Sequence, residues 1–155
     1  MVSKSAVSSG SAFDIDAGTG IVFSRFFGAI TPAEVLSHLL AVGSDARYRR
    51  EMPTLADLRD ARVGWTLQEI VEFRIMLFDT FENRLGGRWA LLTTPQGAAG
   101  VSKLMENLFL RVDTRLFHTR EAALGWLKDL SHAGTAADYP RAEDALRGAT
   151  REGLY

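Results

Sequence analysis

Residues 54–70, TLADLRDARVGWTLQEI, place a short apolar segment just before a helix start. The apolar residues at 55–58 predict a buried strand. Thr66 and Glu69 have the spacing of a capping box, in which each side chain satisfies a backbone N–H that the first helical turn leaves unpaired. A strand that leads into a well-defined helix is typical of an α/β sheet, so this stretch strongly constrains the fold.

Caps and apolar patterns predict further elements on both sides of this stretch. Thr31, Thr94 and Thr119 each precede a helical pattern, and Pro32 suits a first helical position. The strands expected around these helices are residues 13–17, 21–27, 55–58, 89–92 and 115–117. Because strand–helix–strand repeats form right-handed parallel crossovers, we predict an α/β fold. It has a mixed five-stranded sheet with an antiparallel edge hairpin and about four helices.

Length and composition predict one domain of 155 residues. We expect residues 1–12 to be a flexible leader, residues 13–133 the folded domain, and residues 134–155 a polar tail with room for a short helix. The net charge of -1 gives no basic excess of the kind that nucleic-acid-binding proteins carry. No apolar run reaches the roughly 18 residues that a membrane span requires. The absence of cysteine excludes disulfides and thiolate metal sites, and suits a cytoplasmic protein.

Three segments carry a resemblance to a known superfamily. They are DLRDA at residues 57–61, RWALL at residues 88–92, and VDTRLFHTREAALGWL at residues 112–127. On these segments, and over roughly residues 13–130, the chain resembles the SpoIIAA-like superfamily, which includes bacterial STAS domains and STAS/SEC14 domain proteins. Some STAS domains act as anti-sigma-factor antagonists, so the resemblance implies a regulatory role. SEC14-type relatives imply the binding of apolar or lipid-like molecules instead.

The phosphorylation motif of STAS antagonists is absent from this chain. In those proteins the phosphorylated hydroxyl lies in a D-S-S-G-like motif at the start of the helix after the third strand. The matching junction here reads GWTLQ, and Thr66 is its only hydroxyl. The sequence therefore argues against a switch operated by a kinase.

Polar residues at the strand-to-helix junction form the first candidate site. Ligands and partners of α/β sheets dock near the carboxyl ends of the strands. We therefore expect a binding rim made of Asp57, Arg59, Asp60, Trp65, Thr66 and Gln68. Two carboxylates can perform acid–base chemistry when their pKa values differ. An arginine between them more often forms an ion pair that orders a turn, and we favour that interpretation.

The helix expected over residues 67–85 has more apolar residues than one sheet face can cover. Its predicted core stripe consists of Leu67, Ile70, Val71, Leu77, Phe78, Phe81 and Leu85, whereas Phe73, Ile75 and Met76 lie off that stripe. The surplus predicts either a dimer or partner face, or an apolar pocket between the second and third helices. The residues chosen for this face or pocket are Phe73, Met76, Leu77, Met105 and Phe109.

Motifs for catalysis or metal binding are missing. His38, His118 and His132 lack ligand spacing, and neither HExxH nor GxSxG occurs. We therefore predict a non-catalytic cytoplasmic domain without metal or cofactor, which associates with itself or with a protein partner. Carriage of a small apolar ligand is the alternative.

Overall fold

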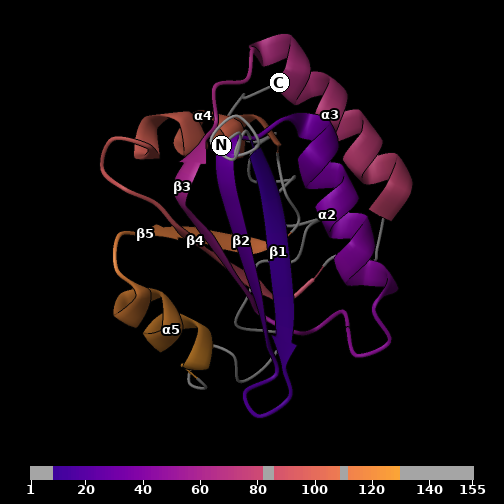
Figure 1. Ribbon diagram of the computed structural model, residues 1–155, viewed down its shortest axis with the longest axis vertical. Coiled ribbons are helices and arrows are strands. Elements are labelled where there is room, and N and C mark those ends of the chain that lie inside the picture. The colour runs from indigo at the N-terminus through magenta and orange to yellow at the C-terminus, as the bar shows by residue number, and fades with distance from the viewer. Residues whose placement is uncertain (1–8, 82–85, 109–111, 130–155) are drawn as a thin grey trace, which may run out of the picture.

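Five strands form a single sheet in the order β1-β2-β3-β4-β5 in the computed structural model, which describes residues 9–81, 86–108 and 112–129. The strands are β1 Ser9–Asp16, β2 Ile21–Ala29, β3 Thr54–Arg62, β4 Arg88–Leu92 and β5 Asp113–Phe117. β1 pairs antiparallel with β2, and all other neighbours are parallel. The predicted mixed sheet with an antiparallel edge hairpin is thus confirmed (Figure 1).

The helices cover the two faces of the sheet unequally. α2 Pro32–Ser44, α3 Leu67–Phe81 and α4 Ala98–Leu108 lie on one face, where α3 contacts both α2 and α4. α5 Arg120–Lys128 lies on the other face, against β3, β4 and β5. Figure 1 shows α5 set apart from the pair α2 and α3. α2 also contacts β1, so this helix lies next to the edge of the sheet that β1 forms.

Local capping explains where three helices begin. The Thr31 and Glu34 side chains form a complete capping box at the start of α2. Thr66 and Glu69 form the same two bonds at the start of α3, and the Thr119 hydroxyl accepts from the backbone N–H of Ala122. Each cap contributes about 1 kcal/mol to stability. These predicted helix starts are confirmed.

Apolar clusters pack the helices on one another and against the sheet. The helices α2, α3 and α4 meet in a cluster of Leu39, Trp65, Ile70, Phe73, Leu77, Phe81 and Leu108. A second cluster joins strand residues to α4 and contains Phe26, Ile30, Ala56, Leu91 and Val101. The cluster beneath α5 contains Ile21, Leu55, Ala90, Leu92, Ala123 and Leu127. None of the helices in the described ranges combines the length and apolarity needed to cross a bilayer.

The start of β1 and the end of β3 differ most from the predicted strand boundaries. β1 begins at Ser9 rather than at residue 13, because residues 9–12 pair with β2, so the end of the expected leader belongs to the sheet. β3 continues to Arg62 rather than ending at residue 58, because its pairing with β2 resumes after a bulge. Residues 1–8 and 130–155 lie outside the described ranges, so the rest of the leader and the tail remain predictions.

Candidate functional site

The predicted rim cluster at Asp57, Arg59 and Asp60 lies inside β3, at the bulge, rather than in the turn after a strand. Arg25 of β2 pairs with Asp57, whereas Phe27 pairs with Asp60, so β3 carries one extra residue there. The Arg59 guanidinium donates to both carboxylate oxygens of Asp57, from Nε at 3.0 Å and from Nη2 at 2.9 Å. The backbone N–H of Arg59 donates to the same carboxylate at 3.0 Å. The hydrogen bonds from Arg59 to Asp57 therefore stabilise the bulge.

Each carboxylate of this cluster has its own arginine. Burial by itself would raise the pKa of Asp57, but the hydrogen bonds from Arg59 outweigh burial and lower that pKa. Asp60 pairs with Arg25 at 3.1 Å, and both side chains are largely exposed. Surface ion pairs of this kind contribute at most about 1 kcal/mol. The arrangement matches the ion-pair interpretation and gives no support to acid–base chemistry.

Trp65 does not belong to an exposed rim. Its side chain is buried, its Nε1–H donates to the carbonyl oxygen of Ile30 at 2.8 Å, and its ring packs edge-on against Phe73. Thr66 and Gln68 are exposed at the start of α3, where the Thr66 hydroxyl accepts from the backbone N–H of Glu69. The predicted rim is therefore divided between a strand, the core and a helix start.

Four of the five residues predicted to form an apolar face or pocket lie in the described part of the chain, and these four are not brought together. Phe73 and Leu77 are each 2% exposed within the core, whereas Met76 is 41% exposed. Met105 packs against a different cluster, around Phe26 and Val101. Phe109 lies outside the described residues. The predicted core stripe of the helix was right for Ile70, Leu77 and Phe81, which are buried. It was wrong for Leu67 and Phe78, which are exposed, and for Phe73, which is buried.

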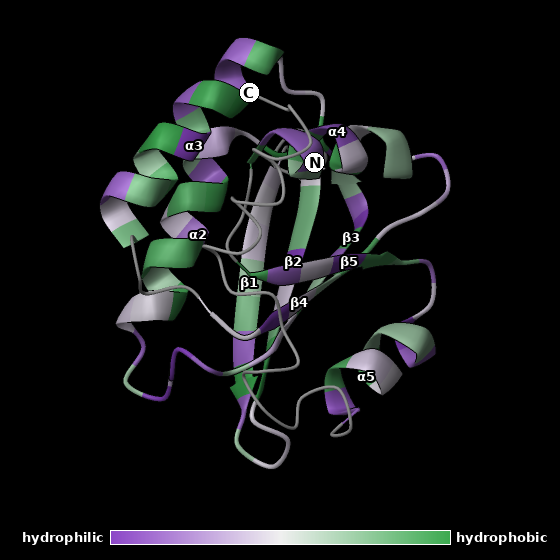
Figure 2. Cartoon of the chain, turned by 180° about the vertical axis from the view of Figure 1, so that it is seen from behind, coloured by the Kyte–Doolittle hydropathy of each residue, from purple (hydrophilic) through white to green (hydrophobic). Residues whose placement is uncertain are grey.

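An apolar stripe remains on the surface of α3. Leu67 and Ile75 are each 54% exposed, Phe78 is 36% exposed, and Val71 is partly buried. Their spacing of four, four and three residues keeps all of them on one side of the helix. Figure 2 shows apolar and hydrophilic residues interleaved along α3. This spacing was present in the sequence, but the apolar residues on other sides of the helix obscured it.

A groove of about 430 Å³ between β1 and α2 was not predicted. Residues 10–13 of β1 form one side, and Ala33, Glu34, Ser37, His38 and Ala41 of α2 form the other. Its helix residues recur every three to four positions, but the sequence alone gave no sign that they face an edge strand. The groove depends on how a strand and a helix lie beside each other.

His38 is a buried polar residue of this region, at 5% exposure. Its Nδ1 lies 2.9 Å from the Ser11 hydroxyl of β1, and its Nε2 lies 2.8 Å from the Ser24 hydroxyl of β2. The rings of Phe13 and Phe26 contact the imidazole. Burial lowers the pKa of His38 to about 4, so the ring is neutral at neutral pH. The histidine thereby ties α2 to both strands of the hairpin.

No metal centre is formed by the described residues. Within residues 9–81, 86–108 and 112–129, no three histidine, cysteine, aspartate or glutamate side chains gather closely enough to hold an ion.

Comparisons with known proteins address the fold. No protein-family model and no curated protein matches the chain. Among solved structures, the chain is similar to an uncharacterised DUF3478-family protein with a SpoIIAA-like fold from Shewanella loihica PV-4. The two are 18% identical over 77% of this chain and 94% of the other, with a TM-score of 0.54. An anti-sigma factor antagonist from Mycobacterium paratuberculosis is 14% identical over 79% of this chain and 96% of the other, with a TM-score of 0.49. The chain has a SpoIIAA-like fold, as the resemblance implied.

Proposed function

We propose that this protein is a non-catalytic binding domain that associates with a partner protein through the exposed stripe of α3, Leu67, Val71, Ile75 and Phe78. The observation that supports it most is the 54% exposure of both Leu67 and Ile75 on a side of α3 that the core does not cover. Apolar side chains aligned along a helix surface gain free energy when a partner covers them.

The polar residues beside the stripe indicate which partner would fit. Gln68, Glu72 and Asp79 each follow a stripe residue by one position, so they lie along one flank of the stripe. Two of the three are acidic. A partner face with apolar residues in its centre and basic residues on one rim is therefore complementary to α3.

The energy available sets the scale of the interface. Burying a whole leucine, isoleucine or phenylalanine side chain contributes about 1.5–3 kcal/mol, and these side chains are roughly half exposed, so each adds about 1 kcal/mol. Association also costs rotational and translational freedom. The stripe is therefore the centre of a larger contact, in which Ile75 and Phe78 act as anchors.

The rival role as a carrier of a small apolar ligand has less support. Its proposed lining divides between the core, the surface and a second cluster, and Phe73 and Leu77 are already packed against core neighbours.

Photo-crosslinking tests the association. A photoreactive amino acid placed at Ile75, in cells of the source organism, should give a discrete crosslinked product. The same amino acid at Glu121, an exposed position on α5, should give none. Phe78→Glu should remove the product while the circular dichroism spectrum stays unchanged. A product of twice the chain mass would identify self-association, and equal products at both positions would contradict the proposal.

A further inference from the structure

The outer edge of β1 carries backbone groups that the sheet does not use. The backbone N–H of Val22 donates to the carbonyl oxygen of Pro53, so Val22 directs its polar groups towards β3. Its partner in β1 is Ile15, which therefore belongs to a non-hydrogen-bonded pair. Because these pairs alternate along an antiparallel ladder, Ser11 and Phe13 also direct their N–H and C=O groups away from β2.

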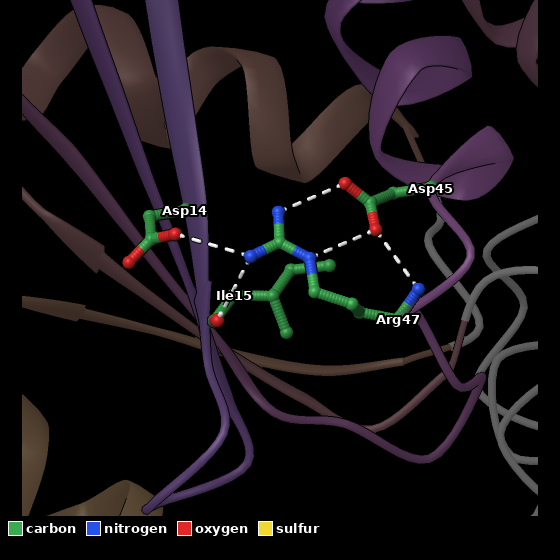
Figure 3. Close-up of polar contacts among 4 residues, drawn as sticks. All are labelled: Asp14, Ile15, Asp45 and Arg47. Carbon is green, nitrogen blue, oxygen red and sulfur yellow. Dashed lines mark hydrogen bonds and ion pairs between the residues drawn. The ribbon is translucent and has the colours of Figure 1, made fainter.

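An arginine closes one end of this edge. The Arg47 Nη1 lies 3.5 Å from the carbonyl oxygen of Ile15 and 3.5 Å from the Asp14 carboxylate. Asp45 holds the guanidinium in place through Nε at 3.0 Å and Nη2 at 2.9 Å (Figure 3). No described residue makes a backbone bond to the outer edge of residues 9–13. The open section of the edge is therefore short and ends at the Arg47 contact.

The groove lies beside this same open section, since residues 10–13 form one of its sides. We propose that the β1–α2 groove binds an extended peptide segment of a partner protein, which adds to the sheet as a strand beside β1. Unpaired N–H and C=O groups along a strand edge select an extended backbone, and a helix next to that edge supplies contacts for alternate side chains.

A single extended strand fits this groove better than a folded second copy. The opposite side of the groove is α2, whose exposed Ala33, Ser37 and Ala41 have short side chains that leave room for those of a peptide. A second copy would bring its own α2 to the same sheet edge. A peptide of about five residues matches the length of the open section at roughly 3.3 Å per residue.

Charge favours a basic residue in the peptide. The Glu34 carboxylate lines the groove and accepts from the Ser9 hydroxyl and from the Thr31 backbone N–H. These bonds hold the pKa of Glu34 below its ordinary value, so the group stays ionised. A carboxylate has about four acceptor sites, which leaves capacity for a lysine or arginine of the peptide.

Selection from a phage-displayed library of random linear peptides on the full chain provides the probe. The most enriched peptide, once synthesised, should protect the Ser11 and Phe13 amides from hydrogen exchange. The Ala12 and Asp14 amides, which already face β2, should show no new protection. This alternation is specific to strand addition. Failure to enrich any peptide, or protection without alternation, would overturn the inference.

Substitutions in the groove give the second test. Ser37→Trp and Ala41→Phe fill the groove from exposed positions, and each should weaken binding of the selected peptide about tenfold or more, measured by fluorescence anisotropy. The matched control is Ala122→Phe, an exposed alanine on α5, which should leave affinity unchanged. Ile75→Glu should also have no effect, so this inference stands or falls separately from the α3 proposal. Unchanged affinity in both groove variants would overturn it.

Discussion

α2 and α3 begin in the same way and lie beside each other on the same face of the sheet, but they differ in what they bury and in what they expose. Both start with a capping box, Thr31 with Glu34 and Thr66 with Glu69. α2 buries a histidine between two serine hydroxyls and borders a groove, whereas α3 buries only apolar residues and exposes others. The comparison teaches that local sequence determines where a helix starts, while its neighbours determine what each side meets.

Position in the sheet explains this difference. α2 contacts β1 at the edge, where polar side chains of the hairpin are available as partners. α3 contacts α2 and α4, and apolar residues from both pack around Phe73 and Leu77. A polar residue can be buried at low cost only where hydrogen-bond partners exist, so the histidine suits α2 and would destabilise the buried side of α3.

The largest effect is expected from the core side of α3. Phe73→Ala should lower the free energy of unfolding by about 3–5 kcal/mol, because it removes a buried ring and leaves a cavity. Urea unfolding followed by circular dichroism measures this loss. The paired control is Ile75→Ala on the exposed side, with an expected loss of about 0.5 kcal/mol or less. Comparable losses in the two variants would break the distinction between the two sides of α3.

Low pH should destabilise the protein through His38 of α2. The folded pKa of His38 is about 4, against an ordinary value of 6.5, so the unfolded chain takes up the proton more readily. Above pH 6.5 the histidine is neutral in both the folded and the unfolded chain. The free energy of unfolding falls as the pH drops from 6.5 towards 4, because only the unfolded chain takes up the proton in that range. The full difference corresponds to about 3 kcal/mol.

Urea unfolding at pH 7 and pH 5 measures this effect. His38→Gln removes the titrating ring and should flatten the difference between the two pH values. Equal pH dependence in the variant and the unchanged chain would show that His38 is not the source.

The two capping boxes should differ by a smaller amount. Glu34 also accepts from the Ser9 hydroxyl at 2.6 Å, so it joins α2 to the first residue of β1. Glu69 is bonded within its own box. Glu34→Ala should therefore cost about 1 kcal/mol more than Glu69→Ala. In a chain that already carries Ser9→Ala, the two substitutions should cost the same, and a persisting difference in thermal unfolding would refute this explanation.

The smallest effect is expected on the exposed stripe. Ile75→Glu should change the free energy of unfolding by about 0.5 kcal/mol or less, since the side chain has few contacts to lose. Such a variant keeps the fold intact while altering the proposed contact surface. A loss near that of Phe73→Ala would mean that Ile75 is part of the core.

The sequence was a good guide to elements and a poor guide to surfaces. The caps at Thr31, Thr66 and Thr119 and the order of strands and helices were predicted because both depend on residues a few positions apart. Thr94 does not cap a helix, because α4 begins only at Ala98. The buried stripe of α3 was predicted correctly at Ile70, Leu77 and Phe81. Because apolar residues occur around much of that helix, Leu67 and Phe78 were wrongly placed in the core and Phe73 was left out of it. Trp65 was wrongly expected in an exposed rim. The hydrogen bond from its Nε1–H to the carbonyl oxygen of Ile30 joins segments far apart in the chain, and no local sequence pattern indicates it.

By itself, the sequence determined where the chain forms strands and helices, since capping bonds and periodicity act within one or two helical turns. Only the tertiary structure decided which surfaces and buried contacts exist. These are the open edge of β1, the groove between β1 and α2, the serine partners of His38 and the exposed stripe of α3. Each of these depends on contacts between segments far apart in the chain, and the order of the residues carries no direct record of such contacts.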